Sequence, residues 1–159
     1  MAYLIDGNNF LGYTSSYALR DPRSKYSLVL KLLLLQRLKR TRVFLVFDGT
    51  PDPNLMDEKF KKKKFSIIYP ALGQNADAVI KELILKQTDR RKFFVVSSDR
   101  DIKDYAKAKG AKTLSSKEFH GQLKKILKEH RKAQELEKKA ISSSPLEINL
   151  WLEVFNQKK

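Results

Sequence analysis

Short apolar segments of this sequence lead into acidic residues at three places. The acids concerned are Asp6, Asp48 and Asp99. Open α/β folds bind their ligands at the carboxyl ends of parallel strands, where polar turns follow apolar strands. Neighbouring strands are about 5 Å apart, so acids that leave adjacent strands can bind the same metal ion. We therefore expect these side chains to meet at one edge of a sheet.

Two further acids can join them. Asp101 lies two residues after Asp99, and Asp77 lies in the first turn of a helix predicted to begin after Asn75. Clustered carboxylates repel one another unless a cation or a proton lies between them. Oxygen ligands suit Mg²⁺ or Mn²⁺ rather than zinc or copper, and such an ion can activate water and neutralise charge on a phosphodiester. The pattern predicts a site for one or two of these ions.

Polar and basic residues beside the acids have possible supporting roles. Asn9, three residues after Asp6, can orient an acid or a water molecule by hydrogen bonding. Ser97 and Ser98 can do the same or contact a phosphate group. Arg100 belongs to the same segment, and we expect it to contact the scissile phosphate.

Each acid also has a purely structural explanation when it is taken alone. Asp48 with Gly49 is a common turn, and Asp77 is a favourable charge at the start of a helix. Asp99 or Asp101 can cap the helix that follows. What favours a metal site is the coincidence of three strands that deliver acids to the same predicted edge.

Alternating apolar segments must position these residues. Strands are predicted at residues 2–5, 43–47, 65–69, 93–96 and 111–114. Helices are predicted at residues 24–40, from 76 onward, and at 102–109, 116–140 and 145–156. Residues 6–9 read as an exit turn and residues 10–23 as mixed structure. This order predicts an α/β fold with a mainly parallel sheet and helices on both faces, in a single domain that covers residues 1–159.

Local signals mark several helix ends. Ser115 and Glu118 have the spacing of a capping box, and Gly110 suits the residue that follows a helix. Residues 141–144 read as a linker before the final helix.

The composition favours a polyanionic partner. The chain has 33 Lys and Arg residues against 18 acids, which gives a net charge of +15. Nucleic acid is the commonest partner of such a surface, followed by the ribosome or an anionic membrane. The alternative is a lysine-rich proteome with solvated faces, over which the composition favours nucleic acid only modestly. The chain has no cysteine, which excludes disulfides and zinc-thiolate sites and fits a cytoplasmic location. We expect no signal peptide and no membrane span, because no basic leader or long apolar segment is present.

A run of lysines lies between the second and third predicted strands. These residues are Lys59, Lys61, Lys62, Lys63 and Lys64. If this connection overhangs the acidic edge, it would receive the phosphate backbone of a nucleic acid; a solvated surface is the alternative. His120 and His130 have no matching acid spacing, so we interpret them as surface or packing residues.

Several enzyme classes lack support in this sequence. It has no GxxxxGK segment for P-loop hydrolysis and no GxGxxG after the first strand for dinucleotide binding. Asp99 and Asp101 form a DxD pattern like that of HAD phosphatases, but in that family the pattern follows the first strand rather than a late one.

Four ordered segments together resemble the NYN domains of the PIN-like nuclease superfamily, and in particular the YacP-like branch. They are residues 4–9 (LIDGNN), 46–49 (VFDG), 76–77 (AD) and 95–101 (VVSSDRD). Residues 95–119 and 151–155 (WLEVF) are also similar to that branch, so the resemblance covers nearly the whole chain.

The resemblance implies a three-layer α/β/α PIN-like fold and a metal-dependent endoribonuclease that acts on messenger RNA in association with the ribosome. It places Asp6, Asp77 and Asp99 on acidic metal positions, Asn9 on the motif asparagine and Asp101 on a further acid. The role of Asp48 in the strand-end FDG element is less defined. Many relatives have a second acid where this chain has Ala78, and residues 74–75 are less acidic or hydroxylated here.

Two functions therefore follow from the sequence. The first is a Mg²⁺- or Mn²⁺-dependent endoribonuclease. The second is an RNA- or ribosome-binding module with little or no catalysis, which the missing acid and the basic charge both favour.

Overall fold

The computed structural model of this protein describes residues 1–15 and 17–141. Its five strands are β1 (Ala2–Asp6), β2 (Arg42–Val46), β3 (Phe65–Ile68), β4 (Phe93–Val96) and β5 (Lys112–Leu114). Its α-helices are α1 (Gly7–Thr14), α2 (Pro22–Lys39), α3 (Ala76–Lys86), α4 (Arg100–Ala108) and α5 (Ser116–Ile141). Three single-turn 3₁₀ helices, Pro53–Leu55, Glu58–Phe60 and Arg90–Lys92, lie in the connections.

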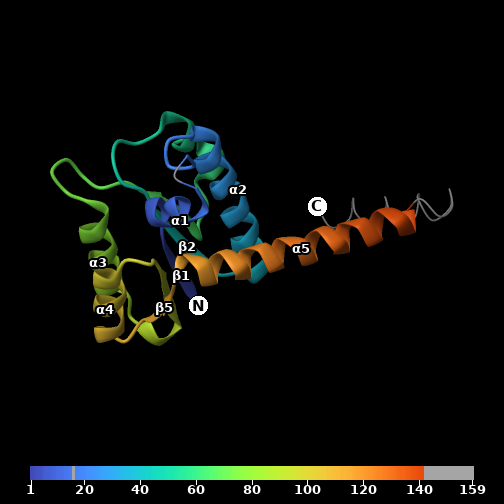
Figure 1. The fold of residues 1–159 in the computed structure, drawn as a ribbon. Helices are drawn as coiled ribbons and strands as arrows, with labels where there is room; N and C mark the ends of the chain where they lie inside the picture. Colours follow the sequence, from blue (N-terminus) through green and yellow to red (C-terminus); the bar gives the residue numbers. More distant parts are fainter. Residues whose placement is uncertain (16, 142–159) are drawn as a thin grey trace. The chain divides into compact units, whose positions relative to one another are not determined.

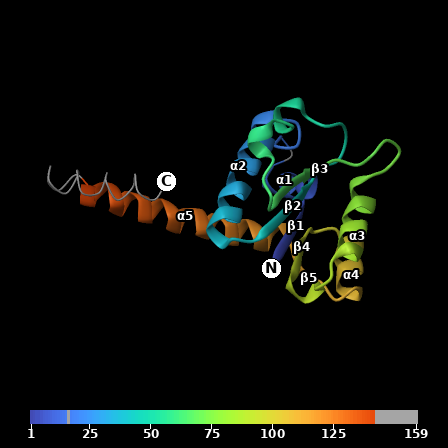
Figure 2. The same ribbon diagram turned by 180° about the vertical axis from the view of Figure 1, so that it is seen from behind.

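The five strands form one parallel sheet in the order β3-β2-β1-β4-β5. The chain builds the sheet outward from β1 to β3 and then crosses to the other side of β1. Helices α3 and α4 cover one face, and α1 and α2 lie on the other (Figures 1 and 2). The predicted α/β/α fold with a mainly parallel sheet is confirmed.

Side chains alternate between the two faces of each strand, as a pleated sheet requires. Leu4, Phe44 and Val95 pack with buried residues of α3 and α4, including Ile80 and Ile102. On the other face, the ring of Tyr3 stacks on Phe94 at 5.4 Å between centroids and contacts Phe119 of α5 at 5.7 Å. Two separate cores therefore hold the sheet in place, and β1 contributes to both.

The predicted helix signals are present. The side chain of Asn75 accepts a hydrogen bond from the Ala78 backbone N–H at the start of α3. Ser115 and Glu118 exchange the two hydrogen bonds of a capping box at 3.0 and 3.2 Å. Gly110 adopts φ +86° directly after α4, a left-handed conformation that glycine accepts most readily.

The exit turn predicted at residues 6–9 was wrong, and the helix predicted from residue 24 begins two residues earlier. Residues 7–9 are not an exit turn but the first turn of α1, which follows β1 without a loop. Helix α2 begins at Pro22 rather than at residue 24, with Asp21 as its cap and proline in the first helical position. Proline lacks only an N–H that would be unpaired there, so Asp21-Pro22 marks a helix start.

Residue contacts divide the chain into two units, Met1–Leu123 and Lys124–Lys159. The first unit contains the sheet, helices α1 to α4 and the start of α5; the part of α5 from Lys124 onward belongs to the second. The predicted linker at residues 141–144 and helix at 145–156 lie outside the described residues, apart from Ile141 as the last residue of α5. None of the helices described is long and apolar enough to cross a membrane.

Candidate active site at the carboxyl end of the sheet

Strand β1 lies at the centre of the sheet, between β2 and β4. The connection that follows β1 leads to β2 and the one that follows β4 leads to β5, away from each other, so a topological switch point lies between the carboxyl ends of β1 and β4, where open α/β folds form their binding crevice. Asp6 is the last residue of β1 and pairs with Val46 of β2. Its place in the strand puts its side chain on the face covered by α3 and α4.

The carboxyl group of Asp6 is buried, with 7% of the residue exposed. The hydroxyl of Ser97, at the end of β4, donates a hydrogen bond to its Oδ2 at 3.0 Å. Burial raises the pKa of Asp6 to about 6; the bond from Ser97 opposes this shift, and the charges of Asp77 and Asp99 add to it. Asp6 is therefore an acid that the fold disfavours in its charged form.

Ser97 also connects Asp6 to the next acid. Its hydroxyl oxygen accepts a hydrogen bond from the Asp99 backbone N–H at 3.1 Å, and no part of Ser97 is exposed. Asp99 in turn caps α4, because its Oδ1 accepts the Asp101 backbone N–H at 2.9 Å. This cap is the structural role foreseen for Asp99, and it leaves the second carboxylate oxygen, Oδ2, outside the capping bond.

Asp77 lies in the first turn of α3, and its charge acts on Asp6 at the end of β1. Its pKa is raised, first by partial burial and then by the charge of Asp99, with smaller contributions from Asp101 and Asp48, while Lys81 lowers it. The carboxylates of Asp6 at the end of β1, Asp77 at the start of α3 and Asp99 at the start of α4 therefore act on one another electrostatically. Asp48 is exposed, and its Oδ1 accepts the N–H of Gly49, whose φ is +84°, so Asp48 also makes the turn that was its structural alternative.

Asn8 and Asn9 hold the first turn of α1 against the ends of β2 and β4. The Asn8 side-chain oxygen accepts the Asp48 N–H at 2.9 Å. That of Asn9 accepts both the Ser98 N–H at 2.9 Å and the Ser116 hydroxyl at 2.8 Å. The predicted role of Asn9 in orienting a ligand or water therefore falls to its side-chain NH₂ group.

Sequence reasoning did not assign a role to Asn8. Two amides directly after a strand-end acid are the signal for such braces, because each can accept a hydrogen bond from a neighbouring strand exit. Ser98 belongs to the same bracing, since its hydroxyl accepts the Ser116 N–H at 3.0 Å.

Gly7 allows α1 to begin directly behind Asp6. A Cβ atom at this position would lie 2.7 Å from two ring carbons of Phe47 and 2.9 Å from the Val46 carbonyl oxygen. Real Cβ atoms do not approach neighbours so closely, and one of the neighbours is backbone. Gly7 is therefore required by close packing rather than by an unusual backbone angle.

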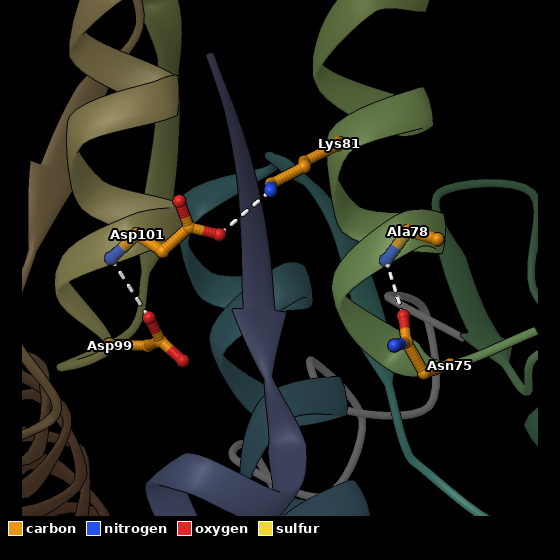
Figure 3. Close-up of polar contacts among 5 residues, drawn as sticks. All are labelled: Asn75, Ala78, Lys81, Asp99 and Asp101. Atoms are coloured by element: carbon orange, nitrogen blue, oxygen red, sulfur yellow. Dashed lines mark hydrogen bonds and ion pairs between the residues drawn. The ribbon is translucent and has the colours of Figure 1, made fainter.

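Lys81 is a basic residue within this acidic edge that sequence reasoning missed. Its ammonium donates a hydrogen bond to Asp101 Oδ2 at 2.7 Å, which joins α3 to α4 (Figure 3). This bond, followed by the charges of Asp101 and Asp77, raises the pKa of Lys81. The available signal was the spacing of four residues from Asp77, which places both side chains on one face of a helix.

The run Lys61–Lys64 lies at the other end of the sheet. The Val43 N–H, at the start of β2, donates to the Lys64 carbonyl oxygen at 2.9 Å, and Phe65 begins β3 beside Val43. These lysines therefore enter β3 at its amino end and do not overhang the acids, so the condition set for their phosphate contact is not met. Arg100 is exposed at the start of α4, and its predicted contact with phosphate stays a prediction.

Lys59 and the two rings beside it form a separate group. Its ammonium lies 5.4 Å from the ring centre of Tyr26 and 5.1 Å from that of Phe60. His120 packs between Phe10 and Tyr13, with ring centres 5.9 and 5.8 Å away, which agrees with its interpretation as a packing residue.

The donor set suits a hard divalent cation by charge and chemistry. Asp6, Asp77 and Asp99 supply only oxygen ligands. The charges of Asp77 and Asp99 raise the pKa of Asp6, and that of Asp99 raises the pKa of Asp77, so a cation among them would relieve repulsion. Within residues 1–15 and 17–141, however, no three His, Cys, Asp or Glu side chains are grouped closely enough to enclose an ion. Mg²⁺ rarely needs such a cage, because it keeps several waters and uses one or two carboxylates together with substrate phosphates. The residues fit an ion held in this open way.

Comparisons with known proteins identify the family and the fold. The family model of the YacP-like NYN domain matches residues 3–158. The fold is similar to the crystal structure of Rae1 (YacP) from Bacillus subtilis, with a TM-score of 0.67 and 21% identity over 99% of this chain and 91% of the other. The W164L mutant of the same protein gives a TM-score of 0.68 and 21% identity over 91% and 86% of the two chains. A comparison with curated protein sequences gives no significant match.

Proposed function

The chain belongs to the YacP-like NYN family, which has a nuclease-type fold, and from this premise we propose that it is a divalent-metal-dependent endoribonuclease. The substrate is RNA, and the finer proposal is messenger RNA presented by the ribosome in the cytoplasm. The observation that carries the proposal is the electrostatic coupling of Asp6, Asp77 and Asp99 at one edge of the sheet. A basic protein that gathers acids at its switch point has the charge pattern of a phosphodiesterase.

Each residue has a defined task in this proposal. Asp6, Asp77 and Asp99 hold Mg²⁺ or Mn²⁺, as one or two ions. Ser97 orients the Asp6 carboxylate through its 3.0 Å hydrogen bond. Asn9 fixes α1 to the end of β4 and offers its side-chain NH₂ group to a water molecule or a phosphate oxygen. When bound, the metal would activate the attacking water and offset charge on the scissile phosphate.

Basic residues would hold the RNA strand. Arg100 is closest in sequence to the acids and is exposed at the start of α4. Lys59 and Lys61–Lys64 lie farther along the surface, so they would contact the strand away from the bond that is cut.

The test is metal-dependent cleavage by the purified full chain. End-labelled single-stranded RNA and ribosome-bound message are incubated with Mg²⁺ or Mn²⁺, with EDTA as the metal-free control. We expect Asp6→Asn and Asp99→Asn to reduce the rate at least about 100-fold, since changes to outer-shell residues alone cost 10- to 100-fold. Asp104→Asn is the matched control, because Asp104 is an exposed acid on the same helix as Asp101. If both site variants cut like the wild type, the assignment is wrong.

A second candidate is an RNA- or ribosome-binding module with little catalysis. It is supported by Ala78 in place of an acid, and by the absence of an ion-enclosing group of three side chains among the described residues. Salt-sensitive RNA binding, without metal-dependent cleavage of free or ribosomal substrates, would favour this candidate. A negative result on free RNA alone would not separate the two, because the ribosome can be needed to present the substrate.

A further inference from the structure

Lys81 holds a positive charge in a fixed place among the acids. It lies one helical turn after Asp77 on α3, and its ammonium is 2.7 Å from Asp101 Oδ2 on α4. The same ammonium lies 5.3 Å from the ring centre of Tyr105. Figure 3 shows the side chain extending from α3 toward Asp101, whose backbone N–H is in turn bonded to Asp99. Asp77 on α3 and both Asp101 and Tyr105 on α4 therefore surround this ammonium.

The Lys81–Asp101 pair differs from the other ion pairs on the surface. The side chain of Lys81 is 31% exposed, whereas the basic partners Arg23, Lys61 and Arg91 are between 60% and 90% exposed. Those three pairs join residues within three positions of each other, but Lys81 and Asp101 are 20 residues apart. Asp101 is itself 71% exposed, so the pair is worth little as a stabilising contact. What sets it apart is that a half-buried lysine one turn after Asp77 is held against the first turn of α4, which suggests a role at the site.

The ammonium keeps donors for a ligand. A lysine side chain has three N–H donors, and the bond to Asp101 uses one of them. The remaining donors can turn toward an anion that approaches Asp77 and Asp99. Such an anion needs a positive contact there, because the carboxylates alone would repel it.

We propose that Lys81 contacts the RNA phosphate at the acidic edge, and that Asp101 positions this ammonium rather than binding the metal. The inference rests on the proposed function and deepens it. With Ala78 in place of a further acid, the site has less negative charge to offset. One divalent ion and one permanent side-chain cation then suffice where a richer acidic set would need two ions.

The proposal predicts opposite changes in two measurements on Lys81→Met. Removal of the ammonium leaves the acids more negative, so the free protein should bind Mn²⁺ up to about fivefold more tightly, in line with the strength of a partly exposed ion pair. The same variant should lose about tenfold or more in kcat/KM for RNA, because a preorganised phosphate contact is absent. Calorimetry with Mn²⁺ alone and steady-state cleavage of a labelled RNA provide the two readouts.

Three further variants distinguish a phosphate contact by Lys81 from a purely structural ion pair between α3 and α4. Lys81→Arg keeps the charge and should keep most of both properties, while Asp101→Asn should weaken RNA cleavage without the loss of Mn²⁺ affinity expected of a metal ligand. Lys86→Met, on the same helix and exposed, is the matched control and should change neither. Thermal unfolding of every variant shows which of them are folded.

The outcomes decide the two proposals separately. The role of Lys81 is overturned if Lys81→Met behaves like Lys86→Met, or if it loses Mn²⁺ affinity and cleavage together. A wild-type protein that binds Mn²⁺ and RNA but cuts nothing would remove the proposed function. The binding affinities of Lys81→Met for Mn²⁺ and for RNA would then still decide whether Lys81 contacts phosphate.

Discussion

Charges at the two ends of the sheet are held in different ways. At the carboxyl end, Asp6 is buried and Asp77 is partly buried, and burial together with the charge of Asp99 raises the pKa of both. At the amino end of β3, Lys61–Lys64 are all exposed, and Lys61 pairs with Glu58 one turn earlier. At the carboxyl end the fold keeps like-charged carboxylates close together although they repel one another. At the amino end of β3 the lysine charges are hydrated and cost little free energy.

This difference shows where the fold has been built for a ligand. Exposed lysines stay hydrated and need no partner, so they are no evidence for a binding site. Carboxylates that are buried or close together destabilise the folded protein unless a cation or a proton offsets their charge. The serine, asparagine and glycine residues around Asp6 have no counterpart at the lysine run, where the described contacts are single pairs. Changes at one end of the sheet at a time, with the free energy of unfolding as the readout, test this difference.

Gly7→Ala should have the largest effect. The added methyl group would lie 2.7 Å from the Phe47 ring and 2.9 Å from a backbone oxygen, so α1 must move away from β2. We expect a loss of about 3 kcal/mol, at the upper end of overpacking costs, measured by urea denaturation. Activity should fall as well, because Asp6 directly precedes this contact.

Gly121→Ala is the matched control for that change. Nothing lies within 4 Å of a Cβ atom at Gly121, which is in α5, so alanine there should raise stability by up to about 1 kcal/mol through helix propensity. Equal effects of the two substitutions would mean that the packing behind Asp6 is not special.

Asp6→Asn should have the next largest effect, in the opposite direction. The folded protein raises the pKa of Asp6 from 3.8 to about 6, so folding favours the protonated form and loses stability as pH rises through this range. Asparagine carries no charge and avoids this loss, so the metal-free variant should be about 2 to 3 kcal/mol more stable than the wild type at pH 8. Urea denaturation at pH 8 and pH 4 in EDTA measures the difference.

The gain should disappear near pH 4, where the wild-type carboxyl is protonated in the folded protein. A variant that is less stable than the wild type at pH 8 would show that the charged form of Asp6 is favoured instead, and the contrast between the two ends of the sheet would be lost.

Local patterns were sufficient to predict most of the fold. The apolar runs at residues 43–47 and 93–96 are strands to within one residue, and Asn75, Gly110 and Ser115 mark helix ends as expected. These features depend on neighbours in the sequence, which the sequence displays directly. Helix α1 was missed because Gly7, Asn8 and Asn9 are turn formers, and only packing against β2 makes them helical.

The acids of the site could be predicted from the sequence, but the hydrogen bonds and the ion pair around them could not. Asn9 accepts from Ser98, 89 residues away, and from Ser116, 107 residues away, and these partners depend on strand order. Lys81 meets Asp101 only because α3 and α4 lie on one face. The position of Lys61–Lys64 could have been predicted from the sequence, since residues that directly precede a strand lie at its amino end.

Asn9→Ala compared with Asn8→Ala tests the bracing at the acidic end. Asn9 accepts two hydrogen bonds, one of them from the hydroxyl of buried Ser116, while Asn8 accepts one from the exposed Asp48. We expect losses of about 2 kcal/mol for Asn9→Ala and about 0.5 to 1 kcal/mol for Asn8→Ala. Each loss is measured by urea denaturation.

The two asparagines are adjacent, so each serves as the control for the other. A larger loss for Asn8→Ala would place the main attachment of α1 at β2 rather than at β4, and the bracing around Asp6 would need to be assigned to the other side of the switch point.

The smallest effect on stability should come from the amino end of β3. Replacing Lys62, Lys63 and Lys64 together by Gln removes three exposed charges, and surface changes of this kind usually alter the free energy of unfolding by no more than about 0.5 kcal/mol each.

The effect of this triple substitution should appear in RNA binding instead. If all three contact phosphates of a single strand, the slope of log affinity against log salt concentration should become shallower by about two units. Fluorescence anisotropy with a labelled RNA at several salt concentrations measures this slope. An unchanged slope would mean that the lysine run is a solvated surface and that RNA is held only near the acids, whereas a large loss of folding stability would show that the two ends of the sheet are built alike.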